Sequence, residues 1–137
     1  MQKILLIMYR KIVSEGMKNS LANNSKIKVY TEHRYENVMY AARTHMPDVV
    51  MLEIPESKAG HPEDYLQICA NLKAALPLCK LLLMCPEDSK ESKQAAIDAM
   101  RSGEIDDFIY FNVTLDYLLS KLEVMNTNYA AKLKGDS

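Results

Sequence analysis

Two kinds of hydrophobic pattern alternate along the chain. Runs of strand length that are apolar except for one charged residue each occupy residues 3–8, 49–54, 80–85 and 107–111, whereas residues 26–30 alternate polar and apolar side chains. A continuous apolar run is typical of a strand buried on both faces, and alternation is typical of a half-exposed strand. We therefore predict five strands, of which the first, third and fourth lie in the middle of a sheet and the second lies near an edge.

Apolar residues between these runs recur at the spacing of amphipathic helices. Residues 23–25 (Asn-Asn-Ser) end the first predicted helix, and Pro47 ends the second. The fourth helix is capped at its start by Asp88 or Ser89 and is followed by Gly103, a turn or C-cap residue. Each predicted helix has its own apolar stripe: Val13, Met17 and Leu21; Tyr35, Val38, Met39, Ala42 and Met46; Tyr65, Ile68, Cys69, Leu72 and Leu76; Ala95, Ala96, Ala99 and Met100; and Leu115, Leu118, Leu119, Leu122 and Met125.

Strands that alternate with helices through short loops predict a parallel sheet with right-handed crossovers. The fold class is α/β, a three-layer, doubly wound, five-stranded flavodoxin-like sheet with strand order 2-1-3-4-5. At 137 residues the chain has the size of one domain. We place that domain at residues 1–125 and a frayed tail or linker at residues 126–137. A polar loop is expected at residues 56–62.

The charge balance excludes some classes of partner. With 17 basic and 18 acidic residues, the chain shows no basic footprint for nucleic acid or an anionic membrane. No apolar run approaches the roughly 20 residues that span a bilayer, and the N-terminus has no signal-peptide pattern. We therefore expect a cytoplasmic protein that binds neither membrane nor nucleic acid through this domain.

Cysteines and histidines give no sign of a disulfide framework or a metal site. The three cysteines form no Cys-x-x-Cys pair and are expected as reduced thiols that pack in the core: Cys69, Cys79 and Cys85. The three histidines fall in separate segments without ligand spacing: His33, His45 and His61.

One carboxylate lies where open α/β sheets place their working groups. Glu53 is the only charged residue in the third predicted strand, residues 49–54, and falls near its C-terminal end. Other chemistries of this architecture lack their motifs: the four glycines form no dinucleotide-binding turn, and no base accompanies a candidate nucleophile. The loop after the first strand is no flavin phosphate loop either, although its Arg10 and Lys11 are two cations able to meet an anion.

Three segments resemble the receiver domain of bacterial response regulators in their order and spacing. They are residues 3–7 with 14–17, residues 46–52, and residues 99–109, the last of which is similar to the Gly-Ala-Asp-Asp-Tyr-Ile turn into the family's fifth strand. The resemblance covers residues 3–125. It implies the doubly wound fold and a phosphoacceptor pocket at the carboxyl ends of the strands.

The resemblance also implies that this pocket is degenerate. Met8 and Tyr9 stand where the family has the acidic pair that helps hold Mg²⁺, and Glu53 stands at the phosphorylated aspartate. Cys85 replaces the Ser or Thr that hydrogen-bonds the phosphoryl group, and Phe111 replaces the lysine that neutralises it. Met and Tyr are no ligands for a hard cation, and a thiol is a poor donor. We expect Mg²⁺ binding and phosphorylation to be lost, with no cofactor and no enzymatic activity.

Two further positions and the fate of the carboxylate complete this interpretation. Phe108 matches the family's switch aromatic without a hydroxyl, and Asn112 matches its cis-proline. Glu53, left without its usual cation, either turns toward water, finds another basic group, or has its pKa raised by burial. As a glutamate it also mimics a phosphorylated aspartate.

The leading hypothesis is therefore a pseudo-receiver that acts in signal transduction by phosphorylation-independent protein contact. The expected partner is a protein or a second copy, bound through the fourth helix, fifth strand and fifth helix. One alternative is a phosphoaccepting receiver in a phosphorelay, including the N-terminal regulatory domain of a transcription regulator. Another is a small-molecule sensor that uses the altered pocket between Tyr9, Glu53, Cys85 and Phe111.

Overall fold

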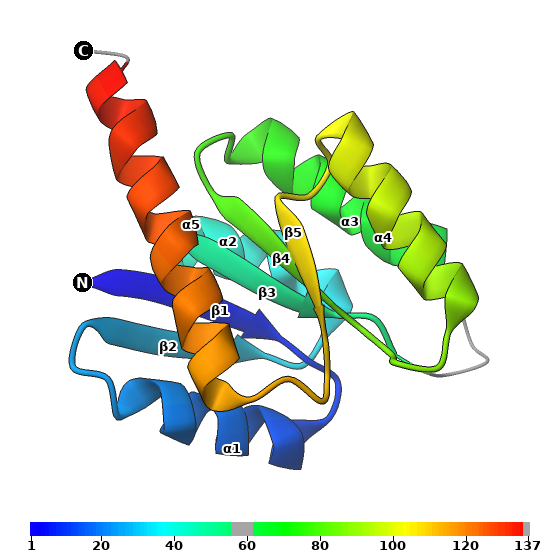
Figure 1. The fold of residues 1–137 in the computed structure, drawn as a ribbon, viewed down its shortest axis with the longest axis horizontal. Coiled ribbons are helices and arrows are strands. Elements are labelled where there is room, and N and C mark those ends of the chain that lie inside the picture. The colour runs from blue at the N-terminus through cyan, green and yellow to red at the C-terminus, as the bar shows by residue number, and fades with distance from the viewer. Residues whose placement is uncertain (56–61, 136–137) are drawn as a thin grey trace.

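A computed structural model describes the backbone of residues 1–55 and 62–135 and the side chains up to residue 125. Its centre is one parallel sheet of five strands in the order β2-β1-β3-β4-β5 (Figure 1), which confirms the predicted topology. The loop expected at residues 56–62 lies, apart from Pro62, outside the described residues. The strands are β1 (Gln2–Ile7), β2 (Ile27–Glu32), β3 (Val49–Glu53), β4 (Lys80–Cys85) and β5 (Asp107–Tyr110).

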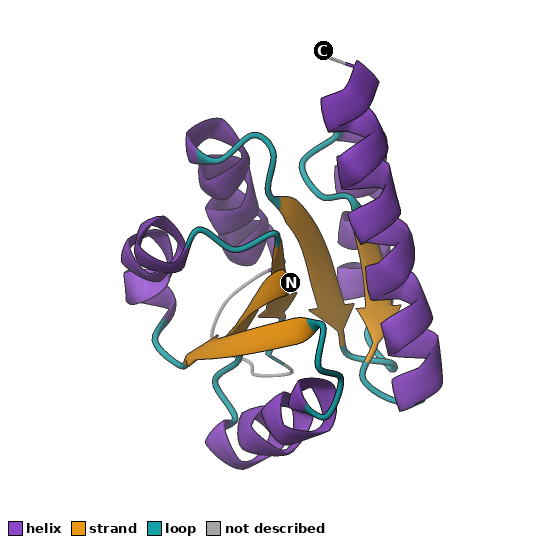
Figure 2. Ribbon diagram, turned by 90° about the vertical axis from the view of Figure 1, so that its left-hand side faces the viewer, coloured by secondary structure: helices purple, strands orange, loops and turns teal. Residues whose placement is uncertain are grey.

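Helices cover both faces of the sheet and complete a three-layer arrangement (Figure 2). Helices α1 and α5 pack on one face, and α2, α3 and α4 pack on the other. Within the described part of the chain, no helix combines the length and apolarity needed to cross a membrane. The helices are α1 (Lys11–Ala22), α2 (Val38–His45) after a 3-10 turn η1 (Tyr35–Asn37), α3 (Pro62–Ala75), α4 (Lys90–Ser102) and α5 (Leu115–Gly135).

Neighbouring residues of the central strands belong to two different core clusters. Leu5 and Ile7 pack under α2, α3 and α4, whereas Ile4 and Leu6 pack under α1 and α5. Side chains of a strand point alternately to the two faces, so a strand covered on both sides must be apolar throughout. This is why the central strands appear in the sequence as unbroken hydrophobic runs.

Cap residues explain where two of the helices end or begin. Ser89 caps α4 by accepting a hydrogen bond from the Ser92 N–H at 3.1 Å, which decides between the two predicted caps. Gly103 follows α4 with φ of 82°, a left-handed conformation that glycine adopts without a Cβ clash. Met46 adopts a left-handed φ of 49° after α2, directly before Pro47, which disfavours helical geometry in the residue that precedes it.

Several positions of the predicted helix stripes need correction. Tyr35 lies in the 3-10 turn rather than in α2. Four stripe residues are exposed rather than core-facing: Val13 (39%), Met46 (57%), Met100 (38%) and Leu115 (42%). Helix α1 instead buries Ser14 and Leu21, seven residues apart and therefore on one side of the helix. Met17 and Leu21 of the predicted stripe do pack on the core, so only its first position, Val13, was misplaced.

Helix α5 is longer than its apolar stripe. It continues to Gly135, ten residues beyond the predicted end at Met125, and its C-terminal turns extend past the sheet (Figure 1). Residues 126–135 include two alanines, a leucine and two lysines, which are good helix formers. Helical propensity therefore continues the helix where the core-facing pattern stops.

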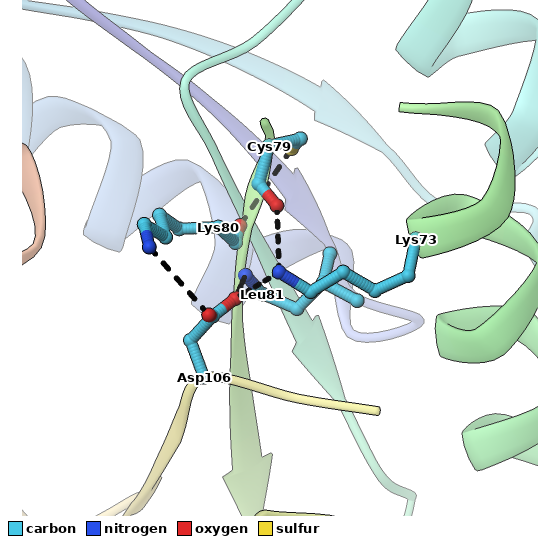
Figure 3. Close-up of polar contacts among 5 residues, drawn as sticks. All are labelled: Lys73, Cys79, Lys80, Leu81 and Asp106. Atoms are coloured by element: carbon cyan, nitrogen blue, oxygen red, sulfur yellow. Dashed lines mark hydrogen bonds and ion pairs between the residues drawn. The ribbon is translucent and has the colours of Figure 1, made fainter. Parts of the chain in front are cut away.

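A polar cluster around Asp106 connects three elements at the amino edge of the sheet (Figure 3). The Asp106 carboxylate accepts hydrogen bonds from Lys73 Nζ of α3 at 2.6 Å and from the Leu81 N–H of β4 at 2.8 Å. Lys73 Nζ also donates to the Cys79 carbonyl at 3.1 Å, and Lys80 Nζ lies 3.8 Å from the second carboxylate oxygen. This cluster fixes the edge of the sheet opposite to Glu53.

Candidate functional site

Glu53 is the last residue of β3 and points to the face covered by α1 and α5. Its alternation with Val49 and Met51, which pack on that face, gives the direction of the side chain. The carboxylate is fully buried, with no exposed surface. A buried carboxylate at the carboxyl edge of a parallel sheet requires a partner, because its desolvation is costly.

Arg10 supplies that partner. It is the N-cap residue of α1, three residues after the end of β1. Its Nε donates a hydrogen bond to Glu53 Oε2 at 2.7 Å, and its Nη2 contacts the same oxygen. The guanidinium also lies over the ring of Phe111, 4.6 Å from the centroid, and Tyr9 lies on a longer cation–π contact of 5.8 Å. One arginine therefore occupies the space between the acid and the aromatic ring.

The two carboxylate oxygens of Glu53 are unequally satisfied. Oε2 receives both guanidinium contacts, whereas Oε1 has no hydrogen-bond partner among the described residues. Burial raises the pKa of Glu53 above its usual value, and the hydrogen bond and charge of Arg10 oppose this shift without cancelling it. Of the three expected fates of the carboxylate, exposure to water is wrong, and pairing with a basic group and a raised pKa both occur.

Tyr35 holds the backbone beneath the carboxylate. Its hydroxyl donates to the Glu53 carbonyl at 2.6 Å and lies 3.5 Å from the Ile7 carbonyl, so it joins the ends of β1 and β3. Burial, with a smaller effect from the charge of Glu53, raises the pKa of Tyr35. The phenol is therefore a fixed donor throughout the physiological pH range.

The structure brings some of the predicted pocket residues together and separates others. Met8 is fully buried in the core cluster under α1 and α5, and Phe111 packs against that cluster. Tyr9 is 43% exposed. Cys85 belongs to the core cluster on the opposite face, and burial raises the pKa of its thiol to about 12, so it remains protonated. It does not face the carboxylate of Glu53.

The aromatic at the family's switch position packs within the domain. Phe108 is partly buried against the cluster under α2, α3 and α4 and meets the ring of Tyr110 edge to face, with centroids 5.9 Å apart.

All three cysteines are free and buried, as expected for structural thiols.

The residues at this site do not fit a magnesium ion. The positions of the family's acidic pair hold a core methionine and a half-exposed tyrosine, neither of which offers a hard oxygen ligand. The guanidinium of Arg10 already places a cation against the only carboxylate there, Glu53, in the part of the site that the structure describes. In that part of the chain, no three His, Cys, Asp or Glu side chains are grouped so that they could hold a metal ion.

Arg10 is the residue of this site that sequence reasoning misses. The sequence marks it only as a cation able to meet an anion. The available signal was its position just after the first strand, beside the strand that carries Glu53. A central acid with no lysine on the fifth strand requires a cation from elsewhere, and the loop after the adjacent strand is the nearest source.

No protein-family model matches the chain, and no curated protein matches it. Solved structures do. NtrX from Brucella abortus, crystallised in complex with ADP, aligns with a TM-score of 0.82 and 19% identity over 99% of this chain and 29% of that chain. The orphan response regulator HP1043 of H. pylori aligns with a TM-score of 0.72 and 16% identity over 90% of this chain and 95% of that one. An adenylate cyclase structure from Rhodopirellula baltica aligns with a TM-score of 0.81 and 13% identity over 98% of this chain and 94% of that one.

These alignments establish the fold of the chain, which is that of response regulator receiver domains. The predicted flavodoxin-like architecture is thereby confirmed. The chain spans less than a third of the NtrX chain, and one protein of the same fold is named as a cyclase. Because one fold serves several functions, the activity has to be argued from the site.

Proposed function

We propose that this chain is a pseudo-receiver, a signalling domain that acts through protein contact and takes up no phosphoryl group. The observation that carries the proposal is the ion pair between Arg10 and the buried carboxylate of Glu53. In this interpretation the arginine provides from within the chain the positive charge that a receiver otherwise obtains from Mg²⁺ and a lysine.

The chemistry of phosphoryl transfer supports this proposal. Transfer depends on positioned cations that offset charge on the equatorial oxygens, and on an in-line approach of the acceptor oxygen. Here Oε2 of Glu53 is occupied by two guanidinium contacts, and the side chain is fully buried. An incoming phosphoryl donor would have to displace Arg10 and would find no acidic pair to recruit a metal ion.

The phosphoaccepting alternative has one observation in its favour. Oε1 of Glu53 has no partner among the described residues and keeps its lone pairs available. A phosphorelay role, or a role as the regulatory domain of a transcription regulator, would require this oxygen to attack without a metal ion.

The altered-pocket sensor is less well supported, since Cys85 packs on the other face and Arg10 fills the space between Glu53 and Phe111.

The contact surface that we propose is the exposed side of α5 beside the edge strand β5. Tyr117 is 49% exposed and Val124 is 56% exposed, seven residues apart on one side of the helix. Lys121 lies between them and pairs with Asp107 at the start of β5 through a contact of 2.7 Å. Exposed apolar residues around a fixed charge pair suit a contact with a partner protein, or a two-fold contact with a second copy of the chain.

Sedimentation velocity over a range of protein concentrations tests this surface. We expect self-association that Val124→Glu weakens at least tenfold, because a charge would be buried in an apolar contact. Ile12→Glu is the matched control, since Ile12 is 91% exposed on α1 and is not part of the proposed surface on α5. Acetyl phosphate should change neither variant nor the parent chain. Loss of association with Ile12→Glu alone, or an increase on adding acetyl phosphate, would contradict the proposal.

A further inference from the structure

A tyrosine-lined hollow of about 420 Å³ opens at the carboxyl edge of the sheet, above β1, β2 and β3. Its size is within the range of sites for small ligands. The chain goes from β1 to β2 on one side and then returns to β3 on the other side of β1, so this edge is the topological switch point of the sheet. Open α/β sheets bind ligands at such points. The hollow borders the Glu53 pocket and shares Tyr9 with it, but the carboxylate of Glu53 points to the face of α1 and α5 and does not line the hollow.

Three tyrosines from three separate segments line the hollow: Tyr9 after β1, Tyr35 after β2 and Tyr65 in α3. The rings of Tyr35 and Tyr65 meet edge to face, with centroids 5.4 Å apart and planes at 77°. The hydroxyl of Tyr35 is fixed on the Glu53 carbonyl at 2.6 Å. The aromatic walls are therefore held in place before any ligand arrives, which lowers the entropic cost of stacking a planar ring on them.

Two basic side chains on the β2–η1 turn border the same hollow. The carboxylate of Glu32 accepts the backbone N–H groups of His33 and Arg34 at 2.9 and 3.1 Å, which fixes the turn. Nδ1 of His33 lies 2.9 Å from the Met8 carbonyl. Because a carbonyl only accepts, Nδ1 carries the proton and Nε2 is left for another group.

The basic side chains that border the hollow are not used in contacts that hold the described fold together. The guanidinium of Arg34 is exposed, and neither it nor Nε2 of His33 has a hydrogen-bond or ion-pair partner among the described residues. Glu36 lines the hollow on the other side of Tyr35 and is also exposed. An arginine is suited to bind phosphate through two parallel hydrogen bonds, and a carboxylate accepts from amino or hydroxyl groups.

We propose that the tyrosine-lined hollow binds a mononucleotide. The base stacks on the face of one tyrosine ring, the phosphate lies against the guanidinium of Arg34, and Glu36 and Nε2 of His33 accept from a ring amino group or a ribose hydroxyl. Proteins often bind nucleotides by stacking the base on an aromatic ring and placing a cation near the phosphate, a mode that does not depend on which base is present. The site uses none of the residues that would accept a phosphoryl group, so it holds whether or not the chain is a pseudo-receiver.

Isothermal titration of the full chain with AMP, ADP and GMP tests the proposal, with backbone amide NMR to locate the site. We expect saturable heat with at least one nucleotide and shift changes centred on residues 33–36. Adenosine and inorganic phosphate, which each lack one half of the ligand, should bind at least tenfold more weakly. Binding of inorganic phosphate as tight as that of a nucleotide would overturn the nucleotide assignment.

Two variants and two matched controls decide whether the hollow is the site. Arg34→Gln should weaken nucleotide binding about tenfold or more, the loss expected for a charged hydrogen bond, and Tyr65→Leu should weaken it by removing a stacking surface. Arg43→Gln and Tyr40→Leu change exposed residues of α2 outside the hollow and should bind as the parent does. No saturable binding up to millimolar nucleotide, shifts centred elsewhere, or an equal loss in the controls would overturn the proposal.

Discussion

The carboxylate of Glu53 is a buried charge with one arginine to compensate it. Arg10 keeps 35% of its side chain exposed while Glu53 keeps none. A pair of this kind gains little net stability over an apolar pair, but removing one partner leaves the other charge buried and unpaired. The pair therefore affects the stability of the fold mainly when one of its two partners is removed.

Replacing Arg10 with methionine, which keeps the stem that covers Phe111, should lower the free energy of unfolding by about 2 kcal/mol at pH 7. This value is at the low end for a broken buried pair because the guanidinium is partly solvated. The double variant Arg10→Met with Glu53→Gln should recover most of the loss, and Arg43→Met serves as an exposed control. Chemical denaturation measures five chains: the parent, Arg10→Met, Glu53→Gln, the double variant and the control. Simple additivity of the two changes would show that the residues are not coupled.

The raised pKa of Glu53 predicts the direction of a pH effect. Between the usual carboxyl pKa of about 4.5 and the raised value, the folded chain holds a proton that the unfolded chain has released. Stability contributed by this group is therefore complete below pH 4.5 and is lost as pH rises through the raised pKa. Relative to the parent, Glu53→Gln should become more stable as pH increases from 4.5 to 8. Denaturation at several pH values checks this, and a difference that moves in the opposite direction would mean that Arg10 dominates the pKa.

At the residue scale, the sequence predicted the acid but not its partner. Glu53 interrupts an apolar run, and such an interruption is visible without any structure. Arg10 lies in a loop, where neither the strand period nor the helix period applies, and its partner is 43 residues away. Cys85 was assigned to the pocket by resemblance, but its place in the core under α3 and α4 depends on which way the strand end turns.

At the scale of elements, Asp106 connects α3, β4 and the start of β5. Asp106→Ala would leave the Leu81 N–H and the Lys73 ammonium without this acceptor. We expect a loss of about 1–3 kcal/mol in the free energy of unfolding. Glu87→Ala, in the exposed turn before α4, is the control and should change stability by less than about 0.5 kcal/mol. Equal effects of the two substitutions would exclude a structural role for the Asp106 cluster.

The extension of α5 predicts that the last turns contribute little to the stability of the domain. The apolar stripe of α5 in the sequence ends at Met125, and the backbone of the helix continues to Gly135, past the sheet (Figure 1). A chain that stops after Met125 should unfold within about 0.5 kcal/mol of the full chain. Thermal and chemical denaturation measure this. A loss above about 1 kcal/mol would place the boundary of the folding unit beyond residue 125.

The predictions of elements succeeded where the local signal was unambiguous. Strand β4 has the predicted bounds, because Pro86 follows an unbroken apolar run. Gly103 ends α4 because its left-handed φ suits a residue without a Cβ. The start of α2 was missed, since the 3-10 turn over residues 35–37 has nearly the same apolar spacing as an α-helix.

At the scale of the whole molecule, the order of the sheet was predicted from the doubly wound topology together with the apolar pattern of the strands. Strands β1, β3 and β4 are apolar on both faces and lie in the middle, while β2 alternates and lies at one edge. Strand β5 is the other edge, although its run is also apolar. The function does not follow from the fold, because the same architecture serves proteins that differ at the carboxyl edge. There this chain combines an acid, an internal arginine and a tyrosine-lined hollow.

The central claim is that the Arg10–Glu53 pair replaces phosphoryl chemistry, and the most direct test is uptake of a phosphoryl group. The chain is incubated with acetyl phosphate and Mg²⁺ and its intact mass is measured, with a phosphoaccepting receiver in the same tube as positive control and Glu53→Gln to locate any adduct. The account predicts that the control gains the mass of one phosphoryl group and that this chain gains none. A phosphoryl adduct on this chain that disappears in Glu53→Gln would contradict it.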